Sequence, residues 1–448
     1  MAAERGVLSY VPYLKEAVEN GAAPDKTGDP FGPRAWRSSM VKLPGKNRAL
    51  NELSVERVGE PVEETLVMLH GYGAGLGFFY RNFEPLTRAK GWRLYALDML
   101  GMGNSARPAF HVRAKDQAGK VAEAESWFID ALEDWRRERG IDNFTLLGHS
   151  LGGYLAVAYA LKYPGRLNKL ILASPVGIPE DPFAVNAEMP EPTDSRMQNE
   201  FTQDQESITS STSASDRAAR AQGKPAASAP RRPLPSWVVW LWDANFSPFN
   251  IVRWAGPLGP RFVSGWTSRR FSHLPDDEAR ALHDYAFGIF RQRGSGEYAL
   301  PYLLAPGAFA RSPLIHRIQD VGRQPIPPPA PEGKPGDLTA SSASSSATEQ
   351  AARESGIPVV LMYGEKDWMD VAGGLAAEEK LKQVHLKMLL HGTAEEKRRE
   401  NGSARVVIIS KAGHHLYLDN ADEFNEVVRQ ELEATREDNA RRRAAGLR

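Results

Sequence analysis

The stretch "LLGHSLGGYLA", residues 146–156, places a serine between two glycines where an apolar run gives way to a helical pattern. The preceding run "FTLLGH" (144–149) is typical of a buried parallel strand, and "LGGYLAVAYALKYPG" is typical of a helix. Gly148-His149-Ser150-Leu151-Gly152 therefore matches G-x-S-x-G in a strand-turn-helix setting, where a serine can act as a nucleophile above a sheet. The alternative is that Ser150 is only a small residue in a tight turn.

Further apolar runs extend this pattern along the chain. Strands alternate with helical stretches such as "VAEAESWFIDALEDWRRERG" (121–140), which ends at Gly140. This alternation predicts an α/β fold with a mostly parallel central sheet and helices on both faces. The other predicted strands are "TLVMLH" (65–70), "RLYALD" (93–98), "KLILAS" (169–174), "PVVLMY" (358–363) and "RVVIIS" (405–410).

Two stretches rich in Ser, Ala, Pro and Gln interrupt the pattern. They contain too few large apolar groups to offset the entropy of ordering the chain, so we expect them to be disordered insertions. Between them lies an aromatic segment that could cover an active site. The expected organisation is an N-terminal extension (1–50), the first half of the core (51–181), a disordered insertion (182–235), a cap (236–321), a second disordered insertion (322–355), the second half of the core (356–436) and a charged tail (437–448).

Composition excludes several classes of function. The 448 residues include 56 basic and 56 acidic side chains, so no overall charge favours nucleic acid. The absence of cysteine excludes disulfides and thiolate metal sites. Phosphate-loop and dinucleotide-binding motifs and H-E-x-x-H are absent, so we expect no cofactor and no metal. No apolar run reaches the ~20 residues that span a bilayer, and "MAAERGVLSYVPYLKEAVENG" predicts no targeting signal.

Two later strand ends supply partners for Ser150. A serine nucleophile needs a base, and the base needs an acid that orients it. Asp367 follows the strand at 358–363 and His414 follows the strand at 405–410, which gives the chain order serine, acid, histidine. Asp370 is the rival acid and His415 the rival base, and Asp367 could instead be a helix cap.

An oxyanion hole needs two N–H donors near the reacting carbonyl. Leu151, directly after Ser150, is expected to supply the first. Tyr72 in "HGYGAGLGFF" is expected to supply the second, because Gly71 and Gly73 allow close approach of the backbone.

Together, "HGYGAG", "DMLGMGNS", "GHSLGG", "YGEKD" and "AGHHLYLDN" resemble the α/β-hydrolase superfamily from residue 65 to about residue 430. "GHSLGGYLAVAYALKYPGRLNKLILASPVGIP", "SGEYALPYLLAPGAFARSPL" and "GHHLYLDNADEFN" more narrowly resemble the cardiolipin-specific deacylase group and related lysophospholipid hydrolases. The resemblance implies a serine hydrolase that releases fatty acid from a membrane phospholipid. Its expected substrate is cardiolipin, giving monolysocardiolipin, at a peripheral membrane surface.

The same resemblance implies alternatives. His414 to Asp419 matches an H-x-x-x-x-D pattern associated with acyl transfer to lysophosphatidic acid, so Asp419 is an accessory candidate, either functional or orienting a loop. A co-activator of another lipase, with a protein partner at a lipid surface, is a second possibility. A soluble peptidase or small-ester hydrolase is a third. The implied location is the mitochondrion, peripheral at the inner membrane, with the cytoplasm or a lipid droplet as the alternative.

The expected cap is rich in tryptophan and arginine. Five of the ten tryptophans fall in residues 237–266, with Arg253, Arg261, Arg269 and Arg270 nearby. Tryptophan favours the headgroup level of a bilayer and arginine pairs with lipid phosphates, so this stretch could dock on a membrane. An aromatic core of the cap would explain the same residues.

Overall fold

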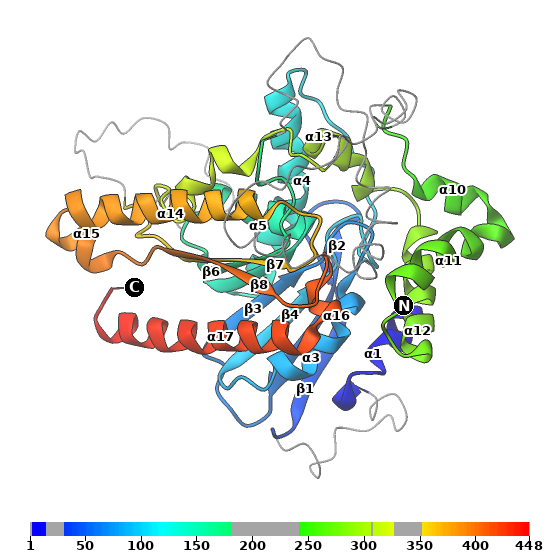
Figure 1. Cartoon of the computed structure of the whole chain (residues 1–448), viewed down its shortest axis with the longest axis horizontal. Helices are drawn as coiled ribbons and strands as arrows, with labels where there is room; N and C mark the ends of the chain where they lie inside the picture. The colour runs from blue at the N-terminus through cyan, green and yellow to red at the C-terminus, as the bar shows by residue number, and fades with distance from the viewer. Residues whose placement is uncertain are drawn as a thin grey trace, which may run out of the picture.

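An eight-stranded sheet forms the centre of the computed structural model, which describes residues 2–14, 31–180, 242, 244–305, 308–326 and 352–447 (Figure 1). The strand order is β1-β2-β4-β3-β5-β6-β7-β8; β2 runs antiparallel to β1 and β4, and the remaining neighbours are parallel. The strands are β1 (Arg34–Lys42), β2 (Ala49–Arg57), β3 (Glu64–Leu69), β4 (Trp92–Leu97), β5 (Phe144–His149), β6 (Leu167–Ala173), β7 (Pro358–Gly364) and β8 (Ser403–Ile409).

The six strands predicted from apolar runs are β3 to β8, each within two residues of its expected bounds. β3 to β7 lie between two layers of helices, so most of their side chains are buried on both faces, whereas β8, an edge strand, buries only two residues. The expected α/β-hydrolase fold class is confirmed.

The N-terminal part of the sheet corrects one expected boundary. Residues 1–50 are not a separate extension, because β1 and the start of β2 belong to the sheet. β1, "RAWRSSMVK", is an edge strand with only two buried residues. An antiparallel edge strand needs to bury only one face, so the search for continuous apolar runs missed it.

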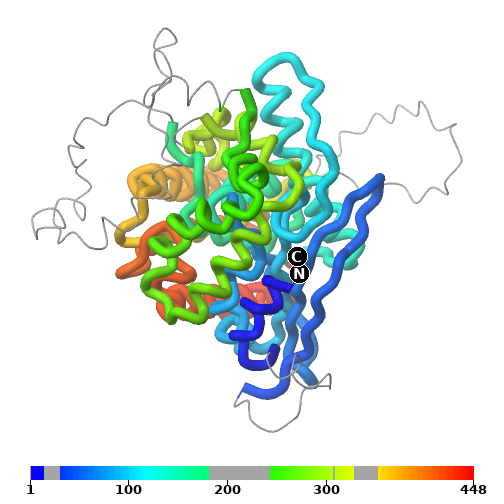
Figure 2. Tube along the Cα trace, turned by 90° about the vertical axis from the view of Figure 1, so that its right-hand side faces the viewer, coloured from blue at the N-terminus to red at the C-terminus, as the bar shows by residue number. Residues whose placement is uncertain are grey.

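Helices form a layer on each face of the sheet (Figures 1 and 2). α4, α5 and α14 pack in one apolar cluster, and α1, α3, α12, α16 and α17 pack in the other. The helices that bracket the sheet are α1 (Ala2–Leu8), α3 (Tyr80–Leu86), α4 (Gln117–Glu138), α5 (Leu151–Lys162), α14 (Val371–His391), α15 (Ala394–Arg399), α16 (Leu416–Asp419) and α17 (Ala421–Ala444).

A set of shorter helices inserted between β6 and β7 forms the cap. Its longest member, α12, packs against both α1 and α11. The cap helices are α10 (Phe249–Trp254), α11 (Gly259–Arg270), α12 (Asp276–Phe290) and α13 (Leu300–Leu303), with 3-10 turns η2 (Gly256–Leu258), η3 (Gly296–Ala299), η4 (Leu314–His316) and η5 (Ile318–Asp320).

The structure describes none of the first expected insertion and only the two ends of the second. The first, 182–235, lies outside the described residues. Of the second, residues 322–326 and 352–355 are described, and they pair with each other: Ile326 N donates to Ala352 O at 2.6 Å and Glu354 N to Gln324 O at 3.0 Å. Glu354 Oε1 also accepts from Gly165 N at 2.7 Å, so both ends of this expected disordered segment are ordered against the core.

Two long helices match or extend the predicted pattern. The helix predicted over 121–140 is α4, which begins at the Asp116 cap and ends just before Gly140, whose φ is 62°. α17 continues through most of the expected charged tail, where Asn439 Nδ2 donates to Glu64 Oε2 at 2.9 Å. Among the residues that the structure describes, no helix combines the length and apolar character needed to span a bilayer.

α1 inserts an acidic side chain into the core. Glu4 is only 3% exposed, and its Oε2 accepts from Asn51 Nδ2 at 2.9 Å and from Asn104 Nδ2 at 2.7 Å. Asn51 Nδ2 also donates to Asp98 Oδ2 at 2.9 Å, so the two carboxyl groups share one donor. Burial, reinforced by the negative charge of Asp98, raises the pKa of Glu4 from 4.5 to about 7.

Replacing Glu4 by Gln should flatten the dependence of stability on pH. Because the folded pKa of Glu4 is raised, its stabilising contribution is complete below about pH 4.5 and is lost as pH rises through about 7. The midpoint temperature of unfolding, measured at several pH values between about 5 and 8, should therefore fall less steeply for Glu4→Gln than for the unmodified protein. Identical slopes for the two proteins would show that Glu4 does not titrate in this range.

Candidate active site

Ser150 occupies a strained turn between β5 and α5. Its backbone has φ 52° and ψ −116°, a conformation that non-glycine residues rarely adopt. A Cβ atom on Gly148 would lie 2.3 Å from Gly152 O, and a Cβ on Gly152 would lie 2.7 Å from the carbonyl oxygens of Leu69 and His70. The two glycines of the motif are therefore required sterically, because backbone atoms fill the space that their side chains would need.

Backbone hydrogen bonds hold this turn in place. Ser150 N donates to Ala173 O at 2.9 Å, and Ser150 O accepts from Gly153 N at 2.9 Å and from Tyr154 N at 3.1 Å. Backbone strain of this kind costs about 1–3 kcal/mol and persists only where the surroundings enforce it. The turn presents Ser150 at the carboxyl end of β5.

Asp367 and His414 meet at the carboxyl ends of β7 and β8. His414 Nδ1 donates to Asp367 Oδ1 at 3.2 Å, and both side chains are fully buried. The carboxylate also accepts from Ser174 Oγ at 2.5 Å, Met369 N at 3.0 Å and Gly364 N at 3.3 Å. These donors fix the carboxylate so that it holds the imidazole of His414 in one orientation.

His149 connects the Ser150 turn to the His414 loop. Its Nε2 donates to the carbonyl oxygen of His414 at 3.0 Å, and the two imidazole rings lie 4.8 Å apart. Burial, reinforced by the neighbouring His414, holds the pKa of His149 well below 6.5, so its ring is neutral. The structure thus brings Ser150, His414 and Asp367 to the same side of the sheet, where the carboxyl ends of β5, β8 and β7 lie.

Sequence reasoning missed His149, because it occupies a variable position of the motif.

The rival acid and base have other partners. Asp370 Oδ1 accepts from Ala372 N at 3.0 Å, which makes Asp370 the N-terminal cap of α14. His415 Nδ1 accepts from Arg270 Nε at 2.9 Å. Burial and the positive charge of Arg270 hold the pKa of His415 well below 6.5. Of the candidate pairs, Asp367 and His414 are the two that contact each other.

Asp419 holds the loop that carries His414. Its Oδ2 accepts from Gly413 N at 2.9 Å, and its Oδ1 pairs with Arg270 Nη2 at 3.0 Å. The side chains of Asp419 and Arg270 are only 4% and 3% exposed. Arg270 is the last residue of α11, so this ion pair joins the cap to the His414 loop. No local pattern indicates it, because its two residues are far apart in the sequence.

The two expected N–H donors belong to segments next to Ser150. Leu151 is the first residue of α5, where an N–H group has no acceptor within its own helix. A Cβ on Gly71 would lie 3.1 Å from Ser150 Cβ, so the backbone leading to Tyr72 passes close to the serine. His70 supports this loop: its Nδ1 donates to Gly71 O at 2.7 Å. Burial lowers the pKa of His70 to about 4.

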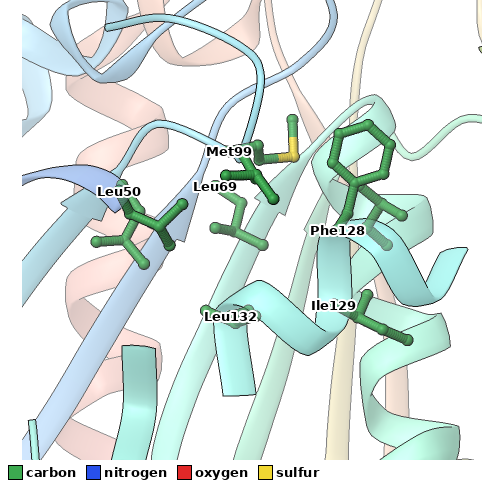
Figure 3. Close-up of a pocket in the computed structure, with 9 residues that line it drawn as sticks. Leu50, Leu69, Met99, Phe128, Ile129 and Leu132 are labelled. Atoms are coloured by element: carbon green, nitrogen blue, oxygen red, sulfur yellow. The ribbon is translucent and has the colours of Figure 1, made fainter. Parts of the chain in front are cut away.

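Two small apolar cavities lie near these residues. One, of about 20 Å³, lies between the strand ends and α4 and is lined by Leu69, Met99 and Phe128 among other residues (Figure 3). The other, also about 20 Å³, lies beside Tyr72 and is closed by aromatic residues of the cap. Each has room for about one water molecule. A fatty-acyl chain that entered beside Tyr72 would have to displace these aromatic rings.

No group of three His, Asp or Glu side chains within the described ranges is arranged to hold a metal ion.

Replacing Gly152 by Ala should destabilise the protein. Its new Cβ would lie 2.7 Å from two backbone oxygens, and overpacking of this kind costs roughly 1–3 kcal/mol. Gly265, inside α11, is the matched control, because nothing lies within 4 Å of its ideal Cβ. Gly265→Ala should leave the free energy of unfolding unchanged or raise it by up to about 1 kcal/mol. Equal effects of the two changes in urea denaturation would contradict this account of the motif.

Comparison with known proteins agrees with this architecture. A family model described as "alpha/beta hydrolase fold" matches residues 64–421. A 1-acylglycerol-3-phosphate O-acyltransferase of Arabidopsis thaliana is 31% identical over 437 residues, covering 96% of this chain and 78% of that protein. The human 1-acylglycerol-3-phosphate O-acyltransferase ABHD5 is 29% identical, covering 82% and 76%. A (lyso)-N-acylphosphatidylethanolamine lipase of Bos taurus is 27% identical, covering 82% and 78%. The family model spans most of the chain and strands β3 to β8 of its sheet, so the protein belongs to the α/β-hydrolase family.

Proposed function

We propose that this protein is a serine-dependent enzyme that cleaves the fatty-acyl ester of a phospholipid and passes the acyl group to water or to a second lipid. The observation that carries the proposal is the buried hydrogen bond between Asp367 and His414, at the sheet edge where the strained turn presents Ser150. An imidazole oriented by a carboxylate is the base that a serine nucleophile needs.

The proposed reaction has two halves. Ser150 Oγ attacks the acyl carbonyl carbon while His414 Nε2 takes its proton, and the N–H groups of Tyr72 and Leu151 stabilise the oxyanion. The ester bond to glycerol then breaks, and the leaving alcohol takes the proton from His414. Water or the hydroxyl group of a lysophospholipid next attacks the acyl-enzyme by the same proton transfers in reverse. The acyl group leaves as a free fatty acid or as a new ester, and Ser150 is restored.

Hydrolysis and acyl transfer differ only in the acceptor. The relatives named 1-acylglycerol-3-phosphate O-acyltransferase support lysophosphatidic acid as the acceptor, and the relative named as a lipase supports water. For hydrolysis, our predicted substrate is cardiolipin, which would give up one fatty-acyl group and leave monolysocardiolipin. In this scheme Asp419 positions the His414 loop for both reactions, because its carboxylate contacts Gly413 and Arg270.

Replacing Ser150 by Ala should abolish both reactions. Purified protein is incubated with vesicles of cardiolipin or phosphatidylcholine, with and without lysophosphatidic acid, and free fatty acid and phosphatidic acid are measured. Loss of the nucleophile should lower both rates by about 10⁴-fold or more, because the two reactions share the acyl-enzyme.

Two outcomes would contradict this scheme. Equal fatty-acid release by the two proteins would exclude Ser150 as the nucleophile. Loss of hydrolysis with full retention of acyl transfer would exclude a shared acyl-enzyme. An inactive variant that has also lost its cooperative thermal unfolding would be replaced by Ser150→Cys, which keeps a nucleophile of similar size and should form a trapped acyl-enzyme visible by mass spectrometry.

Asp367 and Asp370 form a matched pair for testing the acid. Asp367→Asn should lower kcat by about 10³–10⁴-fold, because an amide no longer selects the productive tautomer of His414. Asp370→Asn should change kcat by less than about twofold, because asparagine is an equally good helix cap. The reverse order of effects would reassign the acid to Asp370.

A further inference from the structure

The α10–α11 hairpin exposes large apolar side chains to solvent. Gly256, with φ 51°, makes the turn between the two helices. Around it, Ile251 is 49% exposed, Trp254 74%, Leu258 54% and Phe262 58%. We call these four residues the cap tip. In Figure 1 the hairpin lies at the edge of the molecule, and in Figure 2 it lies on the side that faces the viewer.

Within the hairpin segment the charge is of one sign, and acidic residues begin again at Asp276, the start of α12. Residues 244–275 contain four arginines and no Asp or Glu, although acids and bases are equal in number over the whole chain. Arg253 pairs with Glu297 and Arg270 pairs with Asp419. The expectation that all four arginines could pair with lipid phosphates is therefore wrong for these two. Arg261 and Arg269 are exposed and remain to attract anions at the surface.

The inner side of the same hairpin packs on the loop that carries Tyr72. Phe249 stacks on Tyr72, with ring centroids 5.2 Å apart, and on Phe290 at 4.4 Å. Trp266 lies 5.5 Å from Phe290, and together these rings wall the small cavity beside Gly73. Two short helices therefore carry apolar residues on both sides, one side facing Tyr72 and the other facing solvent.

This arrangement also divides the tryptophans of the cap. Trp254 points to solvent, whereas Trp266 is partly buried in the cavity wall and Trp242 Nε1 donates to Leu304 O at 3.2 Å. Trp237 and Trp240 lie outside the described residues. The two interpretations of the aromatic segment thus apply to different residues, because Trp266 and Trp242 serve the core of the cap and Trp254 does not.

We propose that the cap tip docks on a lipid bilayer that carries anionic phospholipid headgroups. Trp254, Leu258 and Phe262 enter the interfacial layer, and Arg261 and Arg269 face the headgroup phosphates. The bilayer then lies against the hairpin whose other side closes the space beside Tyr72. This inference rests on the proposed function only for the identity of the substrate as a lipid; docking itself requires no turnover.

A second exposed apolar face provides the control. On α14, Leu386 is 54% exposed, Leu389 41% and Leu390 61%. The following helix carries both acids, Glu395 and Glu396, and bases in its last turn, so the charge beside this face is mixed, unlike that of the hairpin segment. Removing leucines here also removes exposed apolar side chains, without touching the hairpin.

The test measures binding of the full chain to vesicles by sedimentation. Ser150→Ala is the background, so that no lipid is consumed, and the vesicles contain phosphatidylcholine alone or phosphatidylcholine with phosphatidic acid. Trp254→Ser with Phe262→Ser should lower the partition coefficient by about tenfold or more. Arg261→Gln with Arg269→Gln should lower binding only to the anionic vesicles, by roughly fivefold for each arginine, and this loss should shrink in high salt. Leu386→Ser with Leu390→Ser should leave binding within about twofold.

Each outcome decides the proposal. Undiminished binding by the Trp254 and Phe262 variant, or a loss caused only by the α14 variant, would overturn the cap tip as the docking surface. Equal binding to neutral and anionic vesicles would overturn the role of the arginines. A dimer in the absence of vesicles that the cap-tip variant abolishes would assign this surface to a second copy of the chain instead. Failure of the proposed reaction is distinguishable, because it would leave vesicle binding intact.

Discussion

The positive φ of Ser150 is the constraint on which the rest of the site depends. An L-residue adopts this conformation only where the neighbouring chain enforces it, and here the end of β6 and the start of α5 do so through hydrogen bonds to the backbone of Ser150. The turn requires glycine at positions 148 and 152, because backbone atoms occupy the space of any side chain. The parallel sheet thus holds Ser150 in an unfavourable conformation at the carboxyl end of β5.

Buried polar contacts hold the remaining site residues against that turn. His149 ties the turn to the His414 loop, and Asp419 holds the same loop from its other side. Because these groups are almost fully buried, an unmade hydrogen bond would cost more than it would in water. The network therefore favours a single arrangement of the loop, with the His414 imidazole against Asp367.

The cap participates in this arrangement rather than simply covering it. Arg270, at the end of α11, contacts both His415 and Asp419. A movement of α11 would therefore displace the loop that carries His414. The same helix carries Phe262 on its exposed side and Trp266 on its inner side. A lipid surface that binds the hairpin would thus act on a helix already connected to the candidate base.

The sequence by itself determined the α/β class, the six strands β3 to β8 and the order of Ser150, Asp367 and His414. Continuous apolar runs and strand-end positions are local signals that depend on burial from both faces of the sheet. β1 and β2 escaped detection, because β1 buries only two residues and polar residues interrupt the apolar positions of β2. Only the tertiary structure decided that Asp367 contacts His414, that Arg270 is buried in an ion pair and that Trp254 faces solvent. Those outcomes depend on contacts between distant segments, which no local pattern encodes.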